Sequence, residues 1–80
     1  MNDVQDKIDR FENMAMADPT NDMAHFSLGS AYLDAERFAD AAKSFEACIA
    51  LNSEMTRAME LGGSALMQLG NKDEAKAMLF

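Results

Sequence analysis

The spacing of apolar residues at the start of the chain predicts an amphipathic helix. Val4, Ile8, Phe11 and Ala15 follow one another at intervals of three or four residues, and acidic residues occupy the other faces. We expect this helix to end before Pro19, because the residue that precedes a proline is disfavoured in the helical region. The same kind of periodicity continues along the chain and favours an all-α fold.

The next two helices are expected to form a hairpin. Asn21 is suited to cap the second helix, because its side chain can accept a hydrogen bond from a free backbone N–H of the first turn. That helix should run from about Asp22 to Ala35. After a short connection at Glu36-Arg37, a third helix carries apolar residues from Phe38 to Leu51.

The last third of the chain is expected to hold two helices. The fourth should follow a break at residues 52–54 and extend to about Leu69. Gly70-Asn71 predicts a left-handed stop followed by a turn, because glycine adopts positive φ without steric cost. A fifth helix then begins at Asp73.

The chain repeats itself at an interval of 34 residues. Small residues of the segment 24–41 return in the segment 58–75, where Ala58, Gly63, Ser64, Ala65 and Ala75 match Ala24, Gly29, Ser30, Ala31 and Ala41. A fixed period of this length is typical of a helix-turn-helix solenoid, in which each unit leaves an apolar face that its neighbour covers. The sequence therefore predicts stacked helical hairpins within a single domain.

The residues from Asp22 to Met55 resemble one tetratricopeptide repeat (TPR). The resemblance depends on Leu28-Gly29, Tyr32, Phe38, Ala41, Phe45, Ile49, Leu51 and Asn52. It implies an all-α fold, a right-handed superhelical stack of antiparallel helix hairpins with about five helices. Residues 1–80 would be a single TPR-like domain: 1–21 the second helix of a preceding repeat, 22–55 a complete repeat and 56–80 a truncated one.

The sequence departs from the family pattern at three places. Gly62 stands where the family usually has leucine, so that two adjacent glycines, each costing about 1 kcal/mol relative to alanine, lie inside a helix. Glu36 occupies a turn position that usually holds glycine, and Ser53 replaces a proline. The segment 10–35 also resembles bacterial TPR modules attached to iron-trafficking domains, but it carries no metal ligands.

Composition and charge narrow the classes of function. Seven basic residues against fourteen acidic ones give a net charge of −7, which disfavours nucleic acid as a partner. The apolar stretches are far shorter than the roughly 20 residues that cross a bilayer, and the first residues lack the features of a signal peptide. We therefore expect a cytoplasmic protein without membrane contact.

Catalytic, metal and cofactor sites are not expected. His25 is interpreted as a partly buried spacer beside Phe26; the alternative, a general base or metal ligand, requires a partner such as Asp22 or Glu60 held close to it. Cys48 is the only cysteine, so the chain can form neither an internal disulfide nor a thiol-based zinc site, and it is interpreted as an inert core residue. The sequence therefore favours a binding module over an enzyme.

The resemblance implies a binding groove, because in this family the first helix of each hairpin lines a concave surface. The groove candidates are Met23, Phe26, Ser30 and Leu33 from the complete repeat and Arg57, Glu60, Ser64 and Met67 from the next one. Residues 26, 30 and 61 lack the lysine and asparagines of the family's carboxylate clamp. The expected ligand is therefore a protein segment, either an amphipathic helix or an extended apolar peptide, held by side-chain anchors. Eight methionines in eighty residues suit such an adaptable surface.

The alternative function is self-association. A solenoid needs a polar cap on its terminal helix, whereas this sequence finishes with apolar residues, so either it is cut from a longer array or this end meets a second copy. A homodimer through the last helix would use Met78, Leu79 and Phe80.

Overall fold

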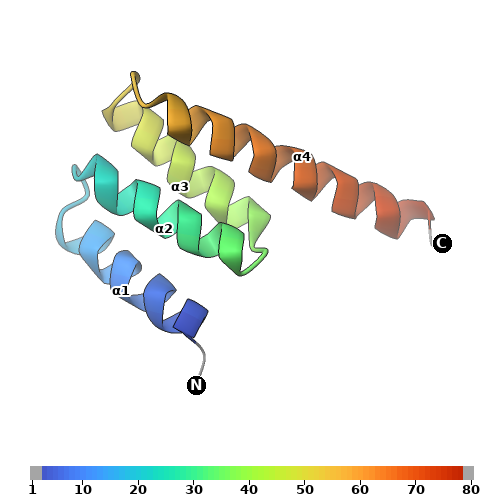
Figure 1. Ribbon diagram of the computed structural model, residues 1–80, viewed down its shortest axis with the longest axis horizontal. Helices are drawn as coiled ribbons and strands as arrows, with labels where there is room; N and C mark the ends of the chain where they lie inside the picture. The colour runs from blue at the N-terminus through green and yellow to red at the C-terminus, as the bar shows by residue number, and fades with distance from the viewer. Residues whose placement is uncertain (1–2, 79–80) are drawn as a thin grey trace.

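The computed structural model describes the backbone of residues 3–78 and the side chains of residues 3–70. Within that range the chain forms four helices and no strands: α1 (Asp3–Ala17), α2 (Asp22–Asp34), α3 (Phe38–Leu51) and α4 (Thr56–Met78). Successive helices run in opposite directions and lie side by side in chain order (Figure 1). The predicted all-α stack of antiparallel hairpins is confirmed.

The turn between α1 and α2 follows from its local sequence. Helix α1 ends two residues before Pro19, and Asn21 caps α2 by accepting a hydrogen bond from the backbone N–H of Ala24 at 3.2 Å. The imidazole Nε2–H of His25 donates to the carbonyl oxygen of Pro19 at 2.9 Å, which ties the first turn of α2 to the loop. Both the predicted break and the predicted cap are present.

Glu36 takes a left-handed conformation in the turn between α2 and α3. Its φ of 59° is the one positive value among the non-glycine residues that the structure describes. The family's preference for glycine at this position has the same origin, because a side chain makes the left-handed region costly. The turn is therefore built with the family geometry but without the family residue.

The predicted break at Gly70-Asn71 and the predicted fifth helix are wrong. Helix α4 is continuous from Thr56 to Met78, and no glycine in the described part of the chain has a positive φ. Residues with good helical propensity flank Gly70, among them Leu69 and Lys72, and they offset the roughly 1 kcal/mol that one glycine costs a helix. The described residues thus hold four helices rather than five.

Phe45 lies at the centre of the core. Its side chain is fully buried, and its ring meets the ring of Phe26 edge-on with centroids 5.8 Å apart. A Cβ added at Gly29 would lie 2.7 Å from the Phe45 ring, and one added at Gly62 would lie 3.2 Å from its Cβ. Because α2 and α4 both pack against this side chain, α3 is the central helix of the fold.

The small residues that recur at the repeat interval are mostly buried. Ala24, Ala31, Ala41, Ala58 and Ala65 lie in the core, as the family resemblance predicts for positions where helices approach closely. Gly63 differs, because it is exposed and a Cβ added there would meet nothing within 4 Å. The second repeat is therefore less completely covered than the first.

Two side-chain hydrogen bonds join elements that are distant in sequence. The hydroxyl of Tyr32 on α2 donates to Glu12 on α1 at 2.6 Å, and Nδ2 of Asn52, just after α3, donates to Asp22 at 3.0 Å. Burial, reinforced by the Glu12 hydrogen bond and charge, raises the pKa of Tyr32 to about 12. The guanidinium of Arg37 lies over the Tyr32 ring, 4.7 Å from its centroid. The Tyr32–Glu12 hydrogen bond thus fixes α1 against α2, and the Asn52–Asp22 hydrogen bond fixes the end of α3 against the start of α2.

Candidate functional site

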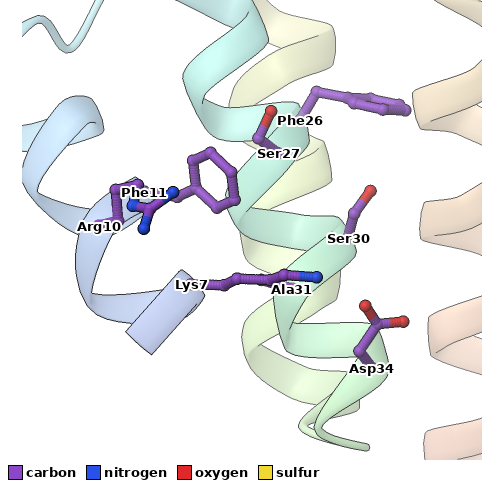
Figure 2. Close-up of a pocket in the computed structure, with 8 residues that line it drawn as sticks. All are labelled: Lys7, Arg10, Phe11, Phe26, Ser27, Ser30, Ala31 and Asp34. Carbon is purple, nitrogen blue, oxygen red and sulfur yellow. The ribbon is translucent and has the colours of Figure 1, made fainter. Parts of the chain in front are cut away.

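A groove with a volume of about 260 Å³ runs between α1 and α2. Figure 2 shows side chains of both helices around it, with α4 beyond α2 on the far side. Its lining is Lys7, Arg10 and Phe11 from α1 and Phe26, Ser27, Ser30, Ala31 and Asp34 from α2. The groove is thus formed across the boundary between the first helix and the complete repeat.

Two aromatic side chains give the groove its apolar part. Phe11 reaches from α1 toward α2, and Phe26 lies on the side of α2 that faces α4 (Figure 2). Both are partly buried and pack against the core, and the contact with Phe45 holds Phe26 in place. Because these rings are anchored by the core, they form a preorganised surface for an apolar side chain.

Charged groups surround this apolar part. Lys7 and Arg10 on α1 are exposed, and Asp34 lies at the lower end of the groove on α2. Among the described residues neither Lys7 nor Arg10 forms an ion pair, and the one salt bridge found there joins Arg37 to Asp40. Two unpaired cations beside aromatic rings attract an acidic group that is attached to an apolar one.

The groove residues expected from the sequence are only partly brought together. Phe26 and Ser30 line the α1–α2 groove, whereas Met23 is exposed outside its lining and Leu33 packs against the core. The four candidates on α4 are all exposed and lie outside the lining: Arg57, Glu60, Ser64 and Met67. Their participation in a groove stays a prediction.

The α1 side of the groove was missing from the sequence-based prediction. That prediction followed the family pattern, in which first helices line the groove, and so it left out Lys7, Arg10 and Phe11. A signal was present, because residues 7, 10 and 11 are spaced three and four apart and share one helical face. In a repeat sequence, a basic and aromatic face on the helix before a binding helix therefore indicates a second wall of the groove.

His25 and Cys48, the two residues whose side chains could take part in catalysis or metal binding, both have structural roles instead. His25 is hydrogen-bonded to the loop carbonyl, and Cys48 is fully buried, with its thiol 3.2 Å from the sulfur of Met55. Burial, with a smaller contribution from Asp22, raises the pKa of the Cys48 thiol, which keeps it protonated and unreactive. The residues with described positions include no cluster of three potential metal ligands among His, Cys, Asp and Glu.

The three predicted self-association residues cannot be placed in the same detail. Met78 is the last residue of α4, and its side chain lies outside the described part of the structure. Leu79 and Phe80 lie outside the described residues altogether. Across the described residues, no helix has the length and apolar character needed to span a bilayer.

Stacked antiparallel hairpins with a groove between consecutive units define a helical-repeat module. A family model described as tetratricopeptide repeat matches residues 24–55 and 57–79, and the chain therefore belongs to the tetratricopeptide repeat family. Searches among curated proteins and solved structures return no match. Repeats of this family generally mediate protein–protein interactions and are typically not enzymes.

Proposed function

We propose that this protein is an adaptor that binds a segment of a partner protein in the α1–α2 groove. The observation that carries the proposal is the pairing of a core-anchored aromatic surface with two cations that have no ion-pair partner in the described structure. The segment places an apolar side chain against Phe11 and Phe26. An acidic residue next to it in the segment meets Lys7 and Arg10.

The size of the groove suits a short segment. Its volume of about 260 Å³ lies just below the roughly 300 to 1,000 Å³ of small-molecule pockets. One or two side chains therefore enter it, while the rest of the segment lies along the surface of α2. A longer amphipathic helix continues past Ser30 toward α4, where Ser64 and Met67 are exposed.

Charge contributes to this interaction without dominating it. The protein as a whole carries a net charge of −7, so an acidic partner is repelled at long range and attracted only close to Lys7 and Arg10. Since the cations are exposed, salt screens them, whereas the apolar contact is not weakened by salt. Affinity should fall with salt but not vanish.

Peptide selection tests the proposal. Random peptides displayed on phage are selected on the immobilised protein, and the affinity of a selected peptide is measured by fluorescence anisotropy. Lys7→Glu should weaken binding roughly tenfold, a loss of about 1.4 kcal/mol. The matched control is Lys43→Glu, which makes the same charge change at an exposed position on α3 and should leave the affinity unchanged. Equal effects of the two variants would contradict the proposal.

A second pair of variants tests the apolar part without changing the charge. Ser30→Leu places a larger side chain in the groove and should block the peptide, while Ser53→Leu adds the same side chain at an exposed loop position and should not. Circular dichroism should be measured for each variant to check that it keeps its helices. Undiminished binding by folded Ser30→Leu would exclude this groove as the site.

A further inference from the structure

A hollow that is separate from the α1–α2 groove lies between α3 and α4. Its volume is about 260 Å³, and Glu46 is the one charged residue in a lining that is otherwise apolar. The other lining residues are Ala42, Phe45 and Ile49 from α3 and Met59, Gly62, Gly63 and Leu66 from α4. None of them lines the α1–α2 groove.

The internal repeat shows what this surface corresponds to. Gly63 and Leu66 lie 34 positions after Gly29 and Tyr32. In the first repeat both positions are covered: Gly29 lies under the Phe45 ring of α3, and Tyr32, only 8% exposed, contacts Glu12 of α1 and Arg37 of the α2–α3 turn. In the second repeat Leu66 is 52% exposed, and a Cβ added at Gly63 would meet no atom within 4 Å. The α4 face is thus a copy of the α2 face without its cover.

The sequence also contains a segment that corresponds to α3 and could cover the exposed face of α4. Helix α3 covers the α2 face with residues that include Ala41 and Phe45, and these positions recur 34 residues later as Ala75 and Leu79. The family match extends through residue 79, so the second half of this repeat belongs to the same pattern. By this correspondence, the partner of Gly63 is Leu79, as Phe45 is the partner of Gly29.

Through Met78, the backbone of α4 does not turn back toward the α3–α4 hollow of its own molecule. Helix α4 is continuous to Met78, and its C-terminal half extends beyond the other three helices (Figure 1). At about 1.5 Å per residue, a straight helix carries Ala75 roughly 18 Å along the axis from Gly63. The described backbone of the segment that matches α3 therefore leads away from the hollow of its own molecule.

We propose that two copies of this chain exchange the C-terminal halves of α4. The two α4 helices run antiparallel, and residues 72–80 of each copy cover the α3–α4 hollow of the other. Leu79 of one copy lies against Gly63 of the second, and the two-fold axis passes near Gly70 and Asn71. Such an interface is isologous and closed, so it gives a dimer and leaves the α1–α2 groove open for a partner.

Sedimentation across the micromolar to millimolar range provides the first test. The wild type should pass from monomer to dimer, and Leu66→Glu should raise the dissociation constant of the dimer at least roughly tenfold. The matched control is Met67→Glu, since Met67 is the next residue on α4, is 70% exposed and lies outside the hollow. A wild type that stays monomeric throughout, or equal effects of the two variants, would overturn the proposal.

Cross-linking distinguishes exchange from a chain that folds back on itself. One preparation carries Gly63→Cys and another Leu79→Cys, and both carry Cys48→Ala, which removes the single natural thiol. A short bis-maleimide should link the two kinds of chain when they are mixed and should not link Gly63→Cys to itself. A third preparation carries both cysteines in one chain, and a link that forms only within that chain, or no link at all, would overturn the proposal. Peptide binding in the α1–α2 groove is measured separately, so either proposal can fail alone.

Discussion

Helices α2 and α4 hold equivalent places in the repeat but have different surroundings. Helix α2 lies between α1 and α3, whereas within one molecule α4 packs mainly on α3. As a result Gly29 is buried against the Phe45 ring while Gly63 is exposed, and Tyr32 is buried while Leu66 is half exposed. A repeat position therefore has no fixed energetic role, because its contribution depends on whether the neighbouring helix is present.

The largest expected effect comes from the residue that α2 and α4 share. Phe45 is fully buried and is contacted from both helices, so Phe45→Ala should destabilise the protein by about 3 to 5 kcal/mol. Urea unfolding followed by circular dichroism measures this loss. Leu66→Ala, at a position 52% exposed, is the control and should cost about 0.5 kcal/mol or less. Similar losses at the two positions would show that the hollow beside Leu66 is already filled within the monomer.

Alanine at the two equivalent glycines should have opposite effects. Gly29→Ala forces a Cβ to within 2.7 Å of the buried Phe45 ring and should cost about 1 to 3 kcal/mol. Gly63→Ala meets no atom and should stabilise the monomer by up to about 1 kcal/mol through helix propensity. Thermal unfolding of dilute samples measures both.

Measuring the stability of the two glycine variants at several protein concentrations distinguishes the positions further. If a second copy covers Gly63, the stabilisation by Gly63→Ala should shrink or reverse at millimolar concentration, where the added Cβ meets Leu79 of the other copy. Gly29→Ala should be equally harmful at all concentrations, since its neighbour Phe45 is in the same chain. A Gly63→Ala variant whose benefit is independent of concentration would argue against the exchanged dimer.

The hydrogen bond between Tyr32 and Glu12 gives the stability of the folded protein a dependence on alkaline pH. The pKa of Tyr32 is raised from 10.0 to about 12 in the folded protein, chiefly by burial and then by Glu12. A raised folded pKa means that the stabilisation is complete below pH 10 and is lost as the pH rises toward 12. Tyr32→Phe should cost about 1 kcal/mol at neutral pH and should make the fall in stability above pH 10 shallower. Urea titrations at several alkaline pH values measure the slope, and identical slopes in the two proteins would refute this role.

Helix boundaries were predictable where local chemistry decides them. Pro19 ends α1 and Asn21 starts α2 through interactions within a few residues, so these boundaries can be read from the sequence. The recurrence of small residues likewise located the helix contacts at Ala31 and Ala65, because only small side chains permit close approach.

The remaining features were not predictable from the pattern of a single repeat. Gly70 permits either a left-handed stop or a continuing helix, and the cost of one helical glycine is small enough for flanking residues such as Leu69 and Lys72 to offset. The α1 side of the groove depends on contacts across a repeat boundary, such as the hydrogen bond between Tyr32 and Glu12. Rules for a single repeat describe neither feature.

The smallest expected effects concern the positions that end α2 and continue α4. Glu36 has a φ of 59° without being glycine, so Glu36→Gly should relieve the left-handed strain and stabilise the protein by a few tenths to about 1 kcal/mol. Gly70 is helical with open space around it, so Gly70→Ala should stabilise α4 by a similar amount and favour the straight helix that exchange requires. Differential scanning calorimetry resolves shifts of this size. Destabilisation by Gly70→Ala together with stabilisation by Glu36→Gly would mean that both residues end helices, and α4 would then have to bend back on its own chain.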